Sequence, residues 1–247
     1  MNNSIQDISS LSLSIAFIPM IIVLGILVKW HMNYGNAIYA IVRMVIQLLI
    51  IGYLLVFIFS AESSWIVVGI LVVMVVASSW IALGTVSEHR RKLLNFALIA
   101  IFVGGVFTLL VITQGVLALD PWYSPRFMVP LAGMIFANAM NTVSLAAERL
   151  SSEISNGVSY EKARNTAFHA SMIPIINSLF AVGLVSLPGM MTGQILSGVS
   201  PLVAVRYQIV VMCMVFSSAG ISSAGFLLMA KSYFADRANN DEAQTSG

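Results

Sequence analysis

Long apolar stretches separated by short polar segments dominate the chain. A helix needs roughly 20 mostly apolar residues to cross a bilayer. A membrane-spanning strand would instead alternate apolar and polar residues over segments of about 10 residues. That alternation is absent here. The pattern predicts seven spanning helices, over residues 11–28, 37–59, 65–84, 96–119, 127–147, 170–187 and 203–230.

The composition of the chain agrees with this pattern. Only 9% of the 247 residues are charged and 59% are hydrophobic, and the mean hydropathy is +0.93. Soluble domains carry about 25% charged residues, which they need to cover their surface. We therefore expect an all-α, polytopic transmembrane helical bundle. It forms a single membrane domain over residues 1–234, followed by a polar, disordered tail over 235–247.

The positions of lysine and arginine predict the orientation of the bundle. Arg90, Arg91 and Lys92 fall between the third and fourth spans, and the segment 148–169 after the fifth span holds Arg149, Lys162 and Arg164. Lysine and arginine concentrate in cytoplasmic loops. These segments share one side only if the N-terminus lies outside and the C-terminus inside. Arg206, near the outer start of the last span, can extend to the interface.

Polar side chains within the predicted spans are the first candidates for a function. Arg43 and Gln47 lie one helical turn apart in the second span. Asn138, Asn141 and Thr142 form a stripe at helical spacing in the fifth span. Such groups line a transport pathway, or they reach the interface and hydrogen-bond between helices. The sequence alone leaves both interpretations open.

The sixth span is short and is followed by an uncharged segment that breaks helical structure. It contains Pro174 and Asn177 and ends at Pro188 and Gly189. Irregular backbone near membrane depth is tolerated where protein or water satisfies it. The segment is a gate or a simple external turn. Its candidate gate residues are Pro188, Gly189, Met190, Met191 and Gln194.

No catalytic motif and no metal cage can be read from the sequence. Met190 and Met191 lie beside the predicted helix break and are the thioethers that raise a soft-metal hypothesis. Methionine is, however, also a common filler of apolar packing. A near match to a phosphate-binding loop ends at Lys231 and Ser232, but it lies at the end of a membrane helix, where that loop cannot form. We expect no nucleotide site in this chain and no nucleic-acid partner.

The segment 148–169 is the only sizeable polar stretch between spans. Ser159 can cap a helix that starts at Tyr160 and runs into the sixth span. Gly157, just before this cap, predicts a turn between two helices. A helix–glycine–helix elbow of this kind is a docking surface for a soluble partner, or an ordinary connector.

Several motifs of the chain resemble a known family. The motif Leu-Pro-Gly-Met-Met-Thr-Gly-Gln at 187–194, the run that begins at Arg206, and the Arg43 and Gln47 pair are similar to FetB-type ABC transporter permeases. That family includes a bacterial iron-export permease and plant aluminium-sensitivity half-transporters. The resemblance extends from the second predicted span to the seventh.

The resemblance implies a metal-transport permease of the cytoplasmic (inner) membrane, with a role in metal homeostasis. It implies that the chain pairs with a second copy of itself, lies in membrane lipid, and is driven by a separate ATPase that binds ATP and Mg. Segment 148–169 then resembles the coupling elbow of such permeases, although polar residues replace the small residues before the glycine. The elbow residues implied to contact the ATPase are Glu153, Gly157, Ser159, Glu161 and Arg164.

Two other interpretations compete with this one. A stand-alone channel or secondary carrier would use the same polar stripe without an ATPase. The absence of carboxylates within the spans counts against proton coupling but not against a passive pore. A membrane scaffold that only recruits a partner would tolerate substitution of Asn141 and Asn177.

Overall fold

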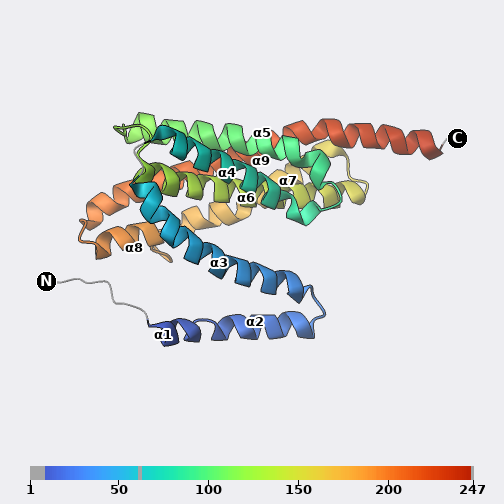
Figure 1. Cartoon of the computed structure of the whole chain (residues 1–247). Helices are drawn as coiled ribbons and strands as arrows, with labels where there is room; N and C mark the ends of the chain where they lie inside the picture. The colour runs from blue at the N-terminus through green and yellow to red at the C-terminus, as the bar shows by residue number, and fades with distance from the viewer. Residues whose placement is uncertain (1–8, 61–62, 246–247) are drawn as a thin grey trace. The chain divides into compact units, whose positions relative to one another are not determined.

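The computed structural model describes the backbone of residues 9–60 and 63–245, without the side chains of 10–11 and 235–245. Within these ranges the chain is helical and contains no strand, as the sequence predicts (Figure 1). It divides into two compact units, Met1–Glu62 and Ser63–Gly247, which are described separately below.

The N-terminal unit contains α1 (Ser10–Ile15), α2 (Ile18–Lys29) and α3 (Tyr34–Phe59). The sequence predicts one span over 11–28, whereas the structure divides it between α1 and α2. Pro19 lies in the first turn of α2, where its missing N–H leaves no hydrogen bond unmade. Asn33 caps α3, and its side chain accepts a hydrogen bond from the backbone N–H of Asn36 at 3.4 Å.

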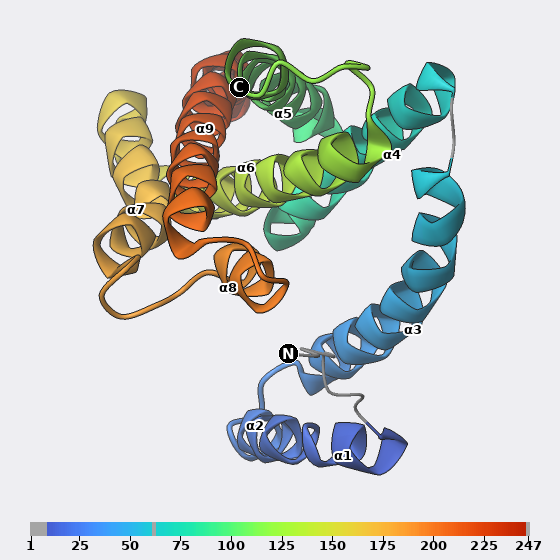
Figure 2. The same cartoon turned by 90° about the vertical axis from the view of Figure 1, so that its left-hand side faces the viewer.

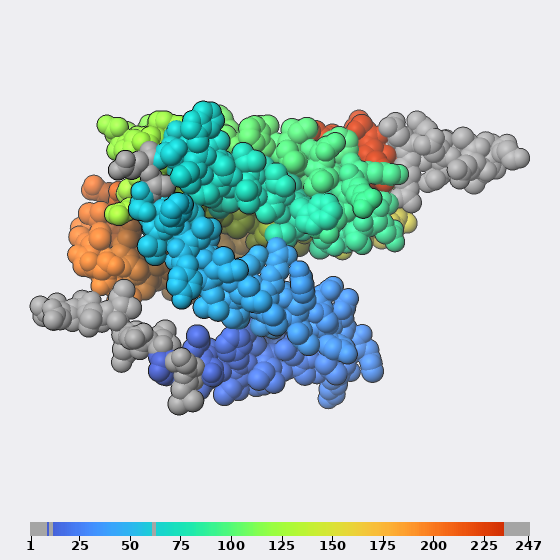
Figure 3. Space-filling view, in the orientation of Figure 1, coloured from blue at the N-terminus to red at the C-terminus, as the bar shows by residue number. Residues whose placement is uncertain are grey.

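The C-terminal unit is a bundle built around α6 and α9. Its elements are α4 (Ser64–Ala82), η1 (Leu83–Val86), α5 (Arg90–Leu110), the π-helical η2 (Val111–Val116), α6 (Pro125–Ser155), α7 (Tyr160–Ala181), α8 (Gly189–Leu196) and α9 (Pro201–Thr245). Helix α6 packs against α4, α5, α7 and α9. Figure 2 shows α9 between α5 and α7, with α8 beside its start. Helices α4 and α5 form the near face of this unit in Figure 3.

In the described ranges, six helical segments are long and apolar enough to span a membrane: Ser12–Lys29, Tyr34–Phe59, Ser64–Val86, Arg90–Val116, Pro125–Ser155 and Pro201–Phe234. The predicted span 170–187 is not among them. The polar first turns of α7 and its end at Ala181 leave too short an apolar stretch. Helix α9 continues to Thr245, so helical backbone extends into the segment predicted to be a disordered tail.

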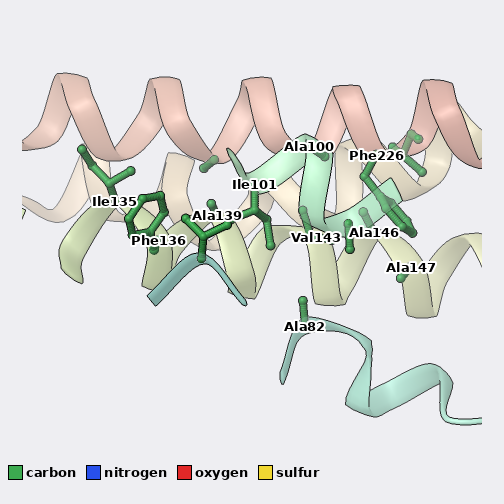
Figure 4. Close-up of a cluster of buried hydrophobic side chains, with 14 of the residues drawn as sticks. Ala82, Ala100, Ile101, Ile135, Phe136, Ala139, Val143, Ala146, Ala147 and Phe226 are labelled. Atoms are coloured by element: carbon green, nitrogen blue, oxygen red, sulfur yellow. The ribbon is translucent and has the colours of Figure 1, made fainter. Parts of the chain in front are cut away.

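Small side chains fill the centre of the bundle. Ala139, Val143 and Ala146 of α6 are fully buried, and they face α5 and α9 residues such as Ile101 and Phe226 (Figure 4). Lipid tails are as apolar as the helices, so helices in a membrane associate mainly through close van der Waals packing, which small residues permit. Several buried hydroxyls satisfy themselves within their own helix. Thr108 Oγ1, for example, donates to the Gly104 carbonyl at 2.7 Å.

Gly104 of α5 lies tightly against Ser222 of α9. A Cβ atom added there would lie 2.4 Å from Ser222 Oγ and 2.9 Å from the Ser222 backbone nitrogen. The backbone nitrogen cannot rotate away as a flexible side chain can, so a larger residue would force the two helices apart.

We predict that Gly104→Ala destabilises the bundle by about 1–3 kcal/mol, the usual cost of overpacking. The matched control is Gly69→Ala in α4, where an added Cβ meets no atom within 4 Å. There the better helix propensity of alanine leaves stability unchanged or slightly higher. Thermal unfolding of both variants in detergent checks this, and equal unfolding temperatures would contradict the close-packing assignment.

Candidate functional site

The predicted elbow is present at the junction of α6 and α7. Gly157 has φ +78°, the left-handed conformation that favours glycine. The backbone N–H groups of Gly157 and Val158 donate to the carbonyls of Ile154 (3.0 Å) and Glu153 (3.1 Å) and so close the end of α6. The turn is shorter than the polar segment suggested, because α6 continues to Ser155 before it ends.

Ser159 occupies the N-cap position of α7, as predicted, with extended backbone (φ −58°, ψ 145°). Its side chain, however, makes no capping hydrogen bond. Glu161 lies in the first turn of α7, where a negative charge interacts favourably with the helix dipole. Gly157, Ser159 and Glu161 are exposed. This part of the elbow is therefore accessible to a partner.

The other two predicted elbow residues are already engaged within the chain. Glu153 forms an ion pair with Arg149, four residues earlier in α6. Arg164 donates from Nε and Nη2 to Asn165 Oδ1 at 3.3 and 3.1 Å. Both side chains are half-buried. These contacts within the chain hold the elbow in place, and they leave the charges of Glu153 and Arg164 less available to a partner.

Tyr160, the first residue of α7, is a contact residue of the elbow that was not among the predicted site residues. Its hydroxyl donates a hydrogen bond to the Leu227 carbonyl in α9, and its ring centroid lies 6.4 Å from that of Phe234. Burial raises the pKa of Tyr160 from 10.0 to about 12, partly opposed by the positive charge of Arg164. Tyr160 thus fastens the elbow to α9. The one indication of this role in the sequence was that Tyr160 directly follows Ser159, the predicted N-cap of α7.

A second aromatic contact links α9 to the start of α5. Tyr233 Oη lies 3.1 Å from His89 Nδ1, and Lys92 Nζ lies 5.8 Å from the centroid of the Tyr233 ring. Tyr233 and Phe234 are adjacent and pack edge-to-face. Together with Tyr160, these residues form an aromatic cluster that joins the elbow, α9 and the α4–α5 connection.

The predicted polar stripe of α6 divides between two surroundings. Thr142 is buried, and its Oγ1 lies within hydrogen-bond distance of the Asn138 and Ala139 carbonyls and of the Ala219 carbonyl in α9 (3.3 Å). Asn138 Nδ2 donates to the Met134 carbonyl at 2.8 Å. Asn141 is exposed. Thr142 therefore contributes to packing, and Asn141 is the stripe residue left free for a pathway.

The break after α7 differs from the prediction. Pro188 and Gly189 do not end the sixth predicted span, because α7 ends at Ala181 and Pro188 is instead the N-cap of α8. Gly183, with φ +83°, turns the chain between the two helices. Asn177 lies on the exposed surface of α7. The predicted gate residues therefore form a short helix.

Helix α8 directs its predicted residues to different surroundings. Met190 packs against the hydrophobic core, whereas Met191 lines a groove of about 460 Å³ between α7, α8 and α9. Gln194 Oε1 is buried, and no hydrogen-bond partner for it is found in the described structure. A second groove of about 500 Å³ lies further along α7 and α9 and shares Phe216 with the first.

Arg43 and Gln47 lie one turn apart on α3, and both are exposed. They belong to the N-terminal unit, whereas the other predicted pathway residues belong to the C-terminal unit. Their part in a pathway stays a prediction. In the ranges that the structure describes, no group of three or more His, Cys, Asp or Glu residues could hold a metal ion.

Comparison with known proteins identifies relatives over most of the chain. The family described as "Uncharacterised protein family (UPF0014)" matches residues 10–160 and 155–234. The UPF0014 membrane protein slr1647 of Synechocystis is 32% identical over 76% of this chain and 79% of its own length. Protein ALUMINUM SENSITIVE 3 of Arabidopsis thaliana is 32% identical over 83% of this chain and 80% of its own.

A third relative carries a functional name. The "Probable iron export permease protein FetB" of Escherichia coli is 31% identical over 85% of this chain and 86% of its own. No solved structure matches the chain. These relatives agree with the resemblance that the motifs of the sequence suggest.

The burial of Tyr160 leads to a prediction about alkaline stability. The folded chain holds the Tyr160 proton up to a pKa of about 12, but the unfolded chain loses it near 10. Stability is therefore fully present below pH 10 and falls as the pH rises from 10 to 12. Tyr160→Phe removes this component, so we expect a smaller loss of stability over that interval.

Tyr53→Phe in α3 is the matched control, because Tyr53 is largely exposed. At neutral pH, Tyr160→Phe costs about 0.5–1.5 kcal/mol, the usual net value of one hydrogen bond. Unfolding of the three proteins at pH 8, 10 and 12 measures both effects. Identical pH dependence of Tyr160→Phe and the unsubstituted chain would show that Tyr160 is not buried as described.

Proposed function

Because the chain belongs to the UPF0014 family, we propose that it is the membrane-spanning permease subunit of an ABC transporter that exports a metal ion. Iron is the first candidate, since one relative is named an iron export permease. The subunit pairs with a second copy of itself in the cytoplasmic (inner) membrane. A separate ATPase binds ATP and Mg²⁺ and drives it.

The observation that carries this proposal is the elbow. It is a sharp helix–glycine–helix turn whose exposed residues Gly157, Ser159 and Glu161 lie next to an aromatic attachment to α9. A docking partner at this turn would act on α6, α7 and α9 together. ATP binding and hydrolysis in the partner then shift the subunit between inward-open and outward-open states, because the partner docks differently on each.

The proposal includes the predicted topology. It has seven spans, with the N-terminus outside and the elbow inside, and α7 with its following turn provides the sixth of them. Arg43, Gln47, Asn138, Asn141 and Asn177, together with 188–194, contribute to the pathway or its gate. The basic residues in the first turn of α5 and around the α6–α7 junction support the inner placement of these ends.

The first experiment is a mild-detergent purification of the tagged full-length chain from its native host, with ATP hydrolysis measured with and without iron. We expect a stoichiometric ATPase subunit and iron-stimulated hydrolysis. If the chain purifies alone and supports flux in liposomes without ATP, it is instead a channel or secondary carrier. If it purifies with an ATPase but without iron stimulation, the ABC assignment stands and iron is excluded.

Gly157→Leu tests the elbow directly. A bulky residue at φ +78° strains the backbone by about 1–2 kcal/mol, although nothing lies within 4 Å of the glycine to clash. The strain alters the turn that docks the partner, and 1.4 kcal/mol corresponds to tenfold in affinity. We therefore expect about tenfold weaker ATPase association, loss of stimulated hydrolysis, and normal membrane insertion.

The matched control is Gly198→Leu. Gly198 also has a positive φ, of +90°, and open surroundings, but it lies between α8 and α9, away from the elbow. The same backbone strain there should leave ATPase association unchanged. Normal transport by Gly157→Leu would refute the assignment of the elbow as the docking site.

A further inference from the structure

Three sulfur-containing residues line the groove between α7, α8 and α9. Met191 of α8 and Met212 and Cys213 of α9 all line it, and Cys213 is the only cysteine in the chain. The other lining groups are apolar side chains such as Leu179 and Phe216, together with Gln208. The volume of about 460 Å³ is ample for an ion and the ligands that complete its coordination.

Gln208 gives this groove a second feature that packing alone does not explain. Its side chain is only 6% exposed, and its Oε1 is buried without a hydrogen-bond partner among the described residues. Buried polar atoms are nearly always satisfied, so an orphaned amide oxygen indicates a missing donor or cation. Gln194 Oε1, on α8 one turn beyond Met191, is orphaned in the same way.

The donor set selects the class of ligand. Thioether and thiolate sulfur prefer soft ions such as Cu(I), whereas iron and the harder divalent ions favour carboxylates and imidazoles. No Asp, Glu, His, Lys or Arg lines this groove. It therefore offers soft sulfur and neutral amide oxygen, but no fixed charge.

Charge balance favours a monovalent ion. The thiolate is the form of cysteine that binds a metal, so binding releases the thiol proton to water. The S–H bond of Cys213 breaks and a sulfur–metal bond forms, with no change in oxidation state. A monovalent cation then leaves the apolar groove neutral. A divalent ion would leave a net positive charge in apolar surroundings, which is costly.

We propose that this groove binds a soft monovalent cation of the Cu(I) and Ag(I) class through Met191, Met212 and the Cys213 thiolate, with the Gln208 amide oxygen as a further ligand. The site goes beyond the proposed function. It specifies which class of metal ion the groove accepts. Metal binding can be measured on this chain alone and does not require the ATPase. Failure of the transporter assignment and failure of this site are therefore distinguishable.

The test uses the single cysteine as its reporter. Purified full-length chain in detergent is titrated with Ag(I), and the rate at which maleimide labels Cys213 is measured. We expect one equivalent of Ag(I) to protect the thiol, while anaerobic Fe(II) at the same concentration does not. Met191→Leu and Met212→Leu should each require at least tenfold more Ag(I) for the same protection. Gln208→Leu should show a smaller shift in the same direction.

Met190→Leu is the matched control, because Met190 neighbours Met191 on α8 but lies outside this groove. It should bind Ag(I) like the unsubstituted chain. Labelling rates without metal show whether each variant keeps the groove intact. If Ag(I) protects the Cys213 thiol equally in the Met191→Leu variant and the unsubstituted chain, the ion binds to the thiol alone. That result would overturn the proposed site. If Fe(II) protects the Cys213 thiol of the unsubstituted chain as strongly as Ag(I) does, the site does not select soft ions. This outcome does not depend on whether any variant folds.

Discussion

The close approach of α5, α6 and α9 is the constraint on which the rest of the C-terminal unit depends. Helices surrounded by lipid gain little from burying apolar surface, so contact between small residues must hold them together. Gly104 of α5 leaves no room for even one added carbon against Ser222, and Ala139 and Ala146 of α6 are fully buried. This packing leaves little space for polar groups. The polar groups buried within it are mostly serine and threonine hydroxyls, several of which donate to carbonyls of their own helix.

The sequence was sufficient for the elements that follow from hydrophobicity and local turn chemistry. The helical class of the fold, the glycine turn at Gly157 and the start of α7 at Tyr160 were all predicted, because each depends on residues close together in the chain. The family resemblance was also correct. The length of an apolar stretch predicted the end of a helix less well. The polar start of α7 and the turn at Gly183 shift the end of that helix away from Pro188.

The sequence could not reveal contacts between residues that lie far apart in it. Tyr160 and Leu227 meet across 67 positions, and His89 and Tyr233 across 144. Their partners are set by how α5, α7 and α9 pack, which hydrophobic periodicity does not determine. The same reason explains Gln208. An amide within a span is a candidate polar site on its own, but its lack of a partner becomes visible only when the neighbouring helices are in place.

Helix α9 connects the elbow to the groove lined by Met191, Met212 and Cys213. Leu227 accepts the Tyr160 hydrogen bond, and Cys213 lines the groove fourteen residues earlier, a separation of about 21 Å at 1.5 Å per residue. No proline interrupts α9 between these positions. A displacement of the elbow that moves Leu227 would therefore move Met212 and Cys213 with it, against Met191 on the separate helix α8. The sulfur-containing residues of the groove come from two helices, α8 and α9, and the Tyr160 hydrogen bond fastens α9 to the elbow. That arrangement links a displacement at the elbow to the spacing between the sulfur-containing residues of α9 and Met191 of α8.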